Sequence, residues 1–308
     1  MKHSYRQLEV FVATARQGSL SRAAESVALS QSAASTALGE FERQLGIQVF
    51  DRVGKSLHLN ALGRQLLPRA REILDRAAEL EALASGGGAF GALEIGATLT
   101  IGNYLATLIV AEFLQRHPDS QIRLEVRNTA TILHDLARQE LDLGLIEGPC
   151  LDPDLAVEPW LADRLTVFCA PTHPLAGQQP ASREELLAAT WILREPGSGT
   201  RRACETAFGA DFPRLKVRLE LEHTEAIKRA VEAGLGSGCI SRLALRDAFR
   251  RGSLVPVACP EIDLERQFSF VWHRQKFQTR AMREFLALCR EKTAGAAYSD
   301  DIDLPTVA

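Results

Sequence analysis

Four polar side chains within one short segment could hydrogen-bond to the edges of nucleic-acid bases or to phosphate oxygens. They are Gln31, Ser32, Ser35 and Thr36, near the start of a predicted helix. Amide and hydroxyl groups make contacts of both kinds in protein–DNA complexes. The segment therefore favours DNA binding. A capped pair of helices in an ordinary helical bundle is the alternative interpretation.

The elements that must position these side chains are two short helices joined by a tight turn within residues 19–46. Ser19 and Ser30 are typical N-cap residues, and small or apolar residues follow them at helical intervals. The arrangement predicts a helix-turn-helix, whose second helix enters the major groove of DNA. The expected packing face of this second helix consists of Ala33, Ala34, Ala37, Leu38 and Phe41.

A two-stranded wing is predicted after these helices, because two apolar runs flank the sequence around Gly54. Basic residues at the tip of such a wing contact phosphates or the minor groove. The candidates for phosphate contacts in and around this region are Arg22, Arg43, Arg52 and Lys55. An exposed charged hairpin without a ligand is the alternative.

The charge is distributed unevenly along the chain. The first 71 residues contain ten Lys and Arg and five Asp and Glu, which gives them a net charge of +5. The whole chain of 308 residues carries −3, so the remainder must carry −8. A basic head on an acidic body is typical of a nucleic-acid-binding module joined to a domain with another task.

An ordered set of residues in the first 63 positions resembles the amino-terminal signature of LysR-type transcriptional regulators. The resemblance implies an α/β protein with an N-terminal winged helix-turn-helix, a long dimerising linker helix and a periplasmic-binding-protein-like effector domain of two subdomains. The matching residues are Leu8, Phe11, Ala15, GSLSRAAESVALSQSAAS at 18–35, Glu42, Leu45 and Gly46, FDR at 50–52 and LNALG at 59–63.

The second helix departs from the family pattern at three positions. Members often carry a basic or amide residue where this chain has Thr36, and basic residues near Gly39 and Glu40. The helix itself is therefore not basic. We expect the phosphate contacts to come from the wing and the flanking arginines instead.

We expect four regions along the chain. They are a winged helix-turn-helix domain (1–60), a linker and dimerisation helix with a hinge (61–88), an effector-binding domain (89–293) and a weakly ordered tail (294–308). Within the effector-binding domain, subdomain I is expected at 91–163 plus 266–293, and subdomain II at 164–265.

The linker helix has a heptad pattern that favours a dimer seam. Pro68 cannot donate its amide hydrogen, so a kink or a restart of the helix is expected near Leu67. Packing of this helix on its own domain is the alternative. The glycine-rich stretch at 85–91 then predicts a hinge. The seam consists of Leu66, Ala70, Ile73, Ala77, Leu80 and Ala84.

From Ala92 onward, strand and helix patterns alternate, which predicts doubly wound sheets with a ligand at the strand ends. Glycines and hydroxyls at several strand-to-helix loops leave N–H groups free for an anion, although simple helix capping would also explain them. The resemblance favours an effector cleft at these loops. The candidate residues are Thr98, Thr100, Asn128, Thr129, Glu147, Glu195, Ser198, Thr200 and Arg201.

A small anion is the expected effector, either a carboxylate or an inorganic oxyanion such as sulfite or sulfate. The spacing of Thr98 and Thr100 is similar to that of sulfur-responsive regulators in the family. Glu147 and Glu195 oppose this expectation, because a carboxylate beside an anion is unfavourable unless it is protonated or paired.

No cofactor and no metal site are expected. The six cysteines show neither C-x-x-C spacing nor nearby histidine clusters, so buried reduced thiols are the expectation. No signal-peptide core and no apolar run of membrane-spanning length is visible, which favours the cytoplasm and no membrane contact.

The expected partners are double-stranded promoter DNA, the effector and further copies of the chain as a dimer, with a tetramer implied by the resemblance. The transcription machinery is a further candidate. Enzymatic activity is not expected, because the sequence has no G-x-S-x-G or Walker motif and no G-x-G-x-x-G motif that opens a dinucleotide-binding unit. The alternative is an enzyme or a solute-binding domain with an N-terminal DNA-binding module.

Overall fold

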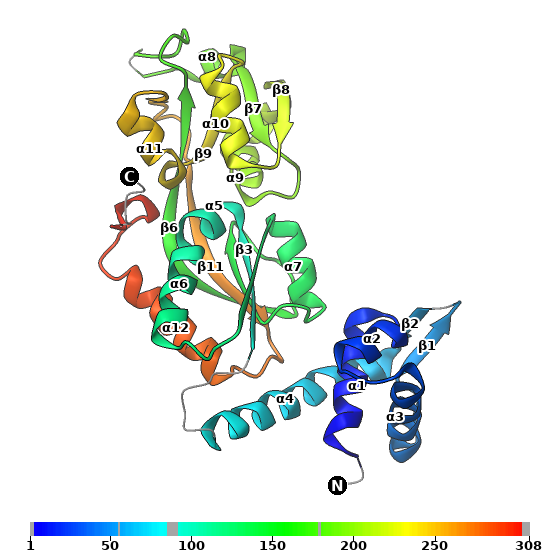
Figure 1. Cartoon of the computed structure of the whole chain (residues 1–308). Coiled ribbons are helices and arrows are strands. Elements are labelled where there is room, and N and C mark those ends of the chain that lie inside the picture. Colours follow the sequence, from blue (N-terminus) through cyan, green and yellow to red (C-terminus); the bar gives the residue numbers. More distant parts are fainter. Residues whose placement is uncertain (1–2, 55, 85–91, 178–179, 304–308) are drawn as a thin grey trace. The chain divides into compact units, whose positions relative to one another are not determined.

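The computed structural model describes residues 3–54, 56–84, 92–177 and 180–303. The chain divides into two compact units (Figure 1). The smaller unit comprises residues 1–91, with 118–120 and 275–281, and the larger unit comprises the rest. The predicted hinge at 85–91 and the wing residue Lys55 lie outside the described residues.

The smaller unit is a winged helix-turn-helix. Its first helix has a capping box at its N-terminus, formed by Ser4. Gly18 is the C-cap of this helix, with a φ of 59° that favours glycine. The wing is a two-stranded antiparallel hairpin. The elements are α1 (Tyr5–Gln17), α2 (Leu20–Ser26), α3 (Gln31–Leu45), β1 (Phe50–Val53), β2 (Ser56–Leu59) and α4 (Ala61–Ala84).

Caps and aromatic packing fix the position of α3. The hydroxyl of Ser30 accepts a hydrogen bond from the Ala33 amide at 3.2 Å, as expected of an N-cap. Ser19 occupies the N-cap position of α2 without a side-chain capping bond. Phe41 stacks on Phe11 at 5.1 Å between ring centroids. Ala33, which we expected on the packing face, is instead exposed, because α3 buries Ala34, Leu38 and Phe41.

Helix α4 begins after Asn60, whose side chain accepts a hydrogen bond from the Gly63 amide at 2.8 Å. It continues through Pro68 as one helix, so the expected restart is not observed. Residues of the predicted dimer seam differ in their burial. Ala70 is buried in the core of the smaller unit, whereas Ile73 and Leu80 are 46% and 69% exposed.

The larger unit is built on a mixed sheet with the strand order β4-β3-β5-β11-β6-β9-β7-β8, and β10 pairs with β6. We call β3, β4 and β5 with their helices the first half, and β7 to β10 with theirs the second half. The strands are β3 (Leu93–Thr98), β4 (Ile122–Arg127), β5 (Leu143–Glu147), β6 (Leu155–Cys169), β7 (Thr190–Arg194), β8 (Lys216–Leu221), β9 (Ser237–Ser241), β10 (Val255–Val257) and β11 (Glu265–His273).

Helices cover both halves of this sheet (Figure 1). Those of the first half are α5 (Leu99–Ile101), the π-helical turn η1 (Gly102–Ala106), α6 (Thr107–Arg116), α7 (Thr129–Ala137) and α12 (Arg280–Lys292). Those of the second half are α8 (Arg183–Ala188), α9 (Gly199–Phe208), η2 (Gly209–Arg214), α10 (Thr224–Glu232) and α11 (Arg242–Arg251). The short helix η3 (Ser299–Asp301) follows α12.

The long strands β6 and β11 join the two halves. They pair antiparallel from Glu265↔Arg164 to His273↔Leu155, with a register shift between Phe268 and Ser269. Strand β11 also pairs with β5, and β6 pairs with β9, so each crossing strand reaches one half. The space between the halves is consequently bounded by the ends of several strands, where ligands bind in such folds.

The segment at 294–308, expected to be weakly ordered, is docked as far as Ile302. Asp300 forms ion pairs with Arg164 at 2.8 Å and with Arg242 at 3.1 Å. Ser299 is fully buried, and Tyr298 forms an isolated β-bridge with Ala162. Asp300, one of the aspartates that suggested a solvated tail, therefore has two cationic partners. Residues 304–308 lie outside the described part of the chain.

All six cysteines are free thiols, and four of them are buried. Among the residues that the structure describes, no helix combines the length and apolar character needed to cross a membrane. The same residues contain no group of three or more metal-ligating side chains able to hold a metal ion.

Candidate DNA-binding face and effector cleft

The polar residues predicted to contact DNA lie on one exposed stretch of α3. Gln31, Ser32, Ser35 and Thr36 are all exposed. The Thr36 hydroxyl donates to the Ser32 carbonyl at 3.0 Å, which leaves its oxygen and its methyl group available to a ligand. Ala33 adds a second exposed methyl group on this surface, of the kind that contacts thymine in the major groove.

Two residues further along α3 shape the same surface. A Cβ atom at Gly39 would meet no heavy atom within 4 Å, so packing does not require glycine there. The Glu40 carboxylate accepts a hydrogen bond from the Gln7 side chain of α1 at 3.1 Å, which tethers this negative charge. The exposed face of α3 consequently has no side chain at Gly39 and lacks a cation of its own before Arg43.

The three described arginines among the predicted phosphate contacts are exposed: Arg22, Arg43 and Arg52. Arg52 lies in β1 of the wing, and Arg43 lies in the last turn of α3. Arg22 donates to the Gln17 carbonyl at 2.8 Å, which fixes its position at the end of α1. These arginines flank the non-basic face of α3.

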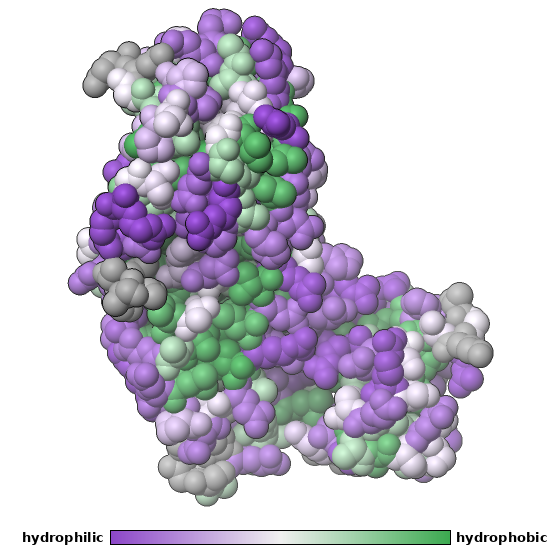
Figure 2. All heavy atoms as spheres, turned by 45° about the horizontal axis from the view of Figure 1, so that its top comes forward, coloured by the Kyte–Doolittle hydropathy of each residue, from purple (hydrophilic) through white to green (hydrophobic). Residues whose placement is uncertain are grey.

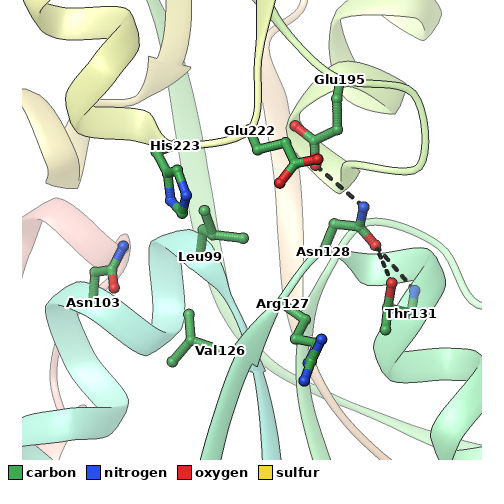
Figure 3. Close-up of a pocket in the computed structure, with 9 residues that line it drawn as sticks. All are labelled: Leu99, Asn103, Val126, Arg127, Asn128, Thr131, Glu195, Glu222 and His223. Atoms are coloured by element: carbon green, nitrogen blue, oxygen red, sulfur yellow. Dashed lines mark hydrogen bonds between the residues drawn. The ribbon is translucent and has the colours of Figure 1, made fainter.

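In the larger unit, a pocket of about 420 Å³ opens between the two halves (Figure 3). Asn103, Arg127 and Asn128 line it from the first half, and Glu195 and His223 from the second. Of these, we predicted only Asn128 and Glu195. Asn103 lies within the π-helical turn η1, and His223 follows the end of β8. Neither position has a local sequence pattern that marks it.

A second pocket of about 370 Å³ lies on the other side of the contact between α7 and α9. It contains five of the predicted effector residues or their neighbours, namely Thr129, Glu147, Ser198, Gly199 and Arg201. The structure therefore distributes the predicted set over two pockets and the buried region between them.

The N-termini of α7 and α9 meet directly between these pockets. The Gly199 amide donates to the Thr129 hydroxyl at 3.0 Å, and the Ala130 amide donates to the Gly197 carbonyl at 3.1 Å. A Cβ atom at Gly199 would lie 2.0 Å from the Glu147 carbonyl oxygen, so only glycine fits. We expected N–H groups at the strand-to-helix loops to be free for an anion, but the Gly199 amide is engaged with the facing helix.

The other predicted residues are also occupied within the protein. Thr98 is 1% exposed, and its hydroxyl donates to the Leu145 carbonyl at 3.4 Å. Arg201 donates to the Arg194 carbonyl at 2.9 Å and forms ion pairs with Glu205 and Glu220. Arg201 lines the second pocket, but its guanidinium is paired with carboxylates of the protein.

A buried network centred on Arg266 connects several of the predicted residues. The guanidinium of Arg266 donates to the Thr200 hydroxyl at 2.9 Å and to the Thr100 hydroxyl at 3.4 Å. It forms ion pairs with Glu147 and with Asp163, the latter at 2.6 Å. Thr100, Thr200, Glu147 and Arg266 are brought together in this way.

Sequence reasoning missed Arg266 and Asp163. Both lie on the crossing strands. In a strand sequence, a charged residue between apolar neighbours is usually exposed, so the pattern alone gives no sign that these two are buried. Asp163 is fully buried and accepts from the Ser241 hydroxyl at 2.7 Å and from the Ser299 hydroxyl. No spacing along the chain links residues 163, 241, 266 and 299, so only the tertiary structure reveals their network.

Ion pairing explains how this cleft accommodates its carboxylates. Glu147 is paired with Arg266, and Glu195 is paired with the buried Arg194 at 2.8 Å. Burial alone would lower the pKa of Arg266, but Glu147 and Asp163 outweigh it and raise that pKa. For Asp163 burial is the largest influence and raises its pKa, although Arg266 and the serine hydroxyls oppose this. The carboxylates that opposed an anionic effector are thus partly neutralised.

Family models match both units of the chain. Residues 5–64 match the bacterial regulatory helix-turn-helix protein of the lysR family, and residues 86–294 match the LysR substrate binding domain. The HTH-type transcriptional regulator YeiE of Escherichia coli K12 is 44% identical over 94% of this chain and 98% of its own. The RuBisCO operon transcriptional regulator of Allochromatium vinosum is 33% identical over 93% of this chain and 96% of its own.

Solved structures agree with this relationship. The Synechocystis CcmR regulatory domain in complex with 2-PG is 30% identical, covers 67% of this chain and 99% of that one, and has a TM-score of 0.62. A full-length OxyR variant from Pseudomonas aeruginosa, 21% identical, shares the fold over 96% of this chain and 97% of its own, with a TM-score of 0.72. The chain belongs to the LysR family of helix-turn-helix transcriptional regulators.

Proposed function

We propose that this regulator binds promoter DNA as a dimer and is controlled by a small anion that enters the cleft between the two halves of its larger unit. The convergence of Thr100, Thr200 and Glu147 on the buried guanidinium of Arg266 is the observation that carries this proposal. Hydroxyl, amide and guanidinium donors from different elements are the groups that recognise carboxylates and oxyanions.

Two further observations support an anionic effector. The cleft carboxylates Glu147 and Glu195 have arginine partners, so their charge opposes an anion less than that of free carboxylates would. The CcmR regulatory domain, 30% identical to this chain, has been solved in complex with 2-PG. A carboxylate or an inorganic oxyanion such as sulfite or sulfate is the chemical class that we propose.

On the DNA side, Gln31, Ser32, Ser35 and Thr36 read base edges from the exposed face of α3. Phosphate contacts come from Arg22, Arg43 and Arg52 around that face. Lys55, which follows Gly54 in the sequence of the wing, supplies a further phosphate contact. Because these cations flank α3 instead of lying on it, they fix the position of the helix, and its polar and methyl groups supply the specificity.

Self-association uses apolar surface that remains exposed on each unit. On α4, Ile73 and Leu80 are seven residues apart and exposed, as a helix-pairing dimer seam requires. Hydrophobic side chains also reach the surface of the larger unit (Figure 2), and the exposed ones include Val217 and Leu219 of the edge strand β8. We assign the seam to the dimer and the edge strand to the association of two dimers into a tetramer.

Regulation then follows from the cleft. An effector that binds one arrangement of the two halves better than another shifts their equilibrium. The shift changes how dimers associate, and the linker helices transmit the change to the wings.

The effector is tested by thermal unfolding of the full-length protein in sulfite, sulfate, phosphate, acetate and 2-PG, at matched ionic strength. At least one anion is expected to raise the melting temperature. Thr100→Ala is expected to remove that response and to leave DNA binding without effector unchanged, since Thr100 does not lie in the smaller unit. If no small anion changes the melting temperature, the proposed effector class is wrong.

A further inference from the structure

We infer that Glu147 is an internal competitor of the effector: its carboxylate occupies the donor set that would hold an anion, and effector binding displaces it. The inference rests on the proposed anionic effector and concerns how its site is kept closed. It also gives a role to a buried glutamate that a plain anion site would not need.

The geometry of the Glu147 carboxylate is that of a bound anion. One oxygen accepts the Thr100 backbone N–H at 3.4 Å. The other accepts the Thr200 hydroxyl at 3.4 Å and forms the ion pair with Arg266. These donors come from the first half, the second half and the crossing strand β11. A single carboxylate thus binds every element that an effector in this cleft would have to bring together.

The donor set remains in place when Glu147 leaves it. Asp163 holds the Nε atom of Arg266 at 2.6 Å, and the Ser241 and Ser299 hydroxyls hold Asp163 in turn. Arg266 therefore keeps a counter-ion and its orientation without Glu147. A buried cation that retained no partner would be costly, whereas this one exchanges one carboxylate for another anion.

Charge balance makes the exchange selective for anions. Glu147 and Arg266 are almost completely buried, with side chains 1% and 3% exposed. A neutral molecule that displaced Glu147 would leave Arg266 with one carboxylate fewer and recover no charge interaction. An anion replaces the ion pair that Arg266 loses with Glu147, and the displaced carboxylate can turn toward the 370 Å³ pocket that Glu147 lines.

The test compares anion binding by the full-length wild type, Glu147→Gln and Glu222→Gln, using isothermal titration with sulfite, sulfate, phosphate, acetate and 2-PG as sodium salts. Glu147→Gln keeps the shape of the side chain and removes its charge. Glu222→Gln removes one exposed negative charge from the neighbouring pocket and is the matched control for general electrostatics. Unfolding curves of each variant check that the fold is intact, and Glu147→Ala provides a second variant if the glutamine variant is unstable.

If Glu147 is a competitor, Glu147→Gln binds the anion about tenfold more tightly than wild type, or binds it where wild type shows no binding. Glu222→Gln then changes affinity less than about threefold, because exposed charges are screened. Equal or weaker binding by a folded Glu147 variant overturns the inference and leaves the anionic effector standing. An equal gain in Glu222→Gln also overturns it. Absence of binding by all three proteins contradicts the proposed effector class itself.

Discussion

The exposed face of α3 and the buried centre of the effector cleft use the same kinds of side chain in opposite states. On α3, Gln31, Ser35 and Thr36 are exposed. In the cleft, Thr100 and Thr200 are 2% and 1% exposed and bond to Arg266 and Glu147. Hydroxyl groups that face solvent can bind at once, whereas those in the cleft must first exchange partners. In the function that we propose, DNA binding therefore needs a matching surface, and effector binding needs a rearrangement.

The largest expected effect tests the buried side of this comparison. Arg266→Met leaves Glu147 and Asp163 buried without their shared cation, which is expected to destabilise the larger unit by about 3–5 kcal/mol. Urea unfolding followed by tryptophan fluorescence measures it, because all three tryptophans lie in that unit.

Arg250→Met is the matched control, since its pairing with Asp247 involves two exposed side chains. An effect below about 1 kcal/mol is expected there. If Arg266→Met cost no more than this control, the buried network would not stabilise the unit as described.

A smaller effect is expected on the exposed side. Gln31→Ala removes an amide able to bond two groups on one base, which lowers discrimination between operator and mutated DNA by about 1–3 kcal/mol. Competition binding with operator variants measures it. Stability should change little, because Gln31 is exposed. Unchanged discrimination at every base pair would remove Gln31 from the proposed contacts.

A substitution at Gly39 is expected to change stability and DNA binding in opposite directions. A methyl group at this position meets no atom of the protein, and alanine is the better helix former, so Gly39→Ala should stabilise the smaller unit by up to about 1 kcal/mol. Because Gly39 lies on the exposed side of α3, the added methyl group is expected to weaken operator binding. Circular dichroism and operator titration measure the two changes. A variant with higher stability and unchanged affinity would show that DNA does not approach this position.

The smallest effect concerns a contact across the cleft that is partly exposed. The Glu225 carboxylate of α10 accepts from Tyr104 and from the ammonium of Lys228, the latter at 2.8 Å. Burial alone would raise the pKa of Glu225, but Lys228 and Tyr104 outweigh it and lower that pKa. Glu225→Gln should cost only about 0.5–1 kcal/mol, because the side chain is 60% exposed.

The pH dependence follows from the direction of that shift. A lowered pKa means that the charged form stabilises the fold above the ordinary glutamate value of 4.5, and that this contribution is lost as the pH falls through the lower value in the folded protein. The difference in melting temperature between wild type and Glu225→Gln is therefore largest near neutral pH and declines in acid. A difference that grew in acid would contradict the assignment.

The two regions also differ in how far the sequence predicts them. Around α3, caps and packing residues lie within a few positions of one another, so Ser30, Leu38 and Phe41 mark the helix from local pattern alone. The cleft threonines follow strand ends and could be identified in the same way. The network that binds them could not, because Asp163, Ser241, Arg266 and Ser299 meet only through the crossing strands and the docked C-terminal segment.

The C-terminal segment is a second region that the sequence alone predicts poorly. A run containing Asp300, Asp301 and Asp303 is typical of a solvated tail. Asp300 instead pairs with Arg164 and Arg242, which lie far away in the sequence. Local composition could not reveal this pairing.

The central claim is that an anion in the cleft controls how this regulator occupies DNA. The most direct test is a footprint of the full-length protein on the DNA upstream of its own gene, with and without the anion that raises its melting temperature most. We expect a protected operator whose length or hypersensitive sites change at saturating anion, and no such change for Thr100→Ala. A footprint that stays identical at saturation, with unchanged transcription from the same DNA, would contradict the account.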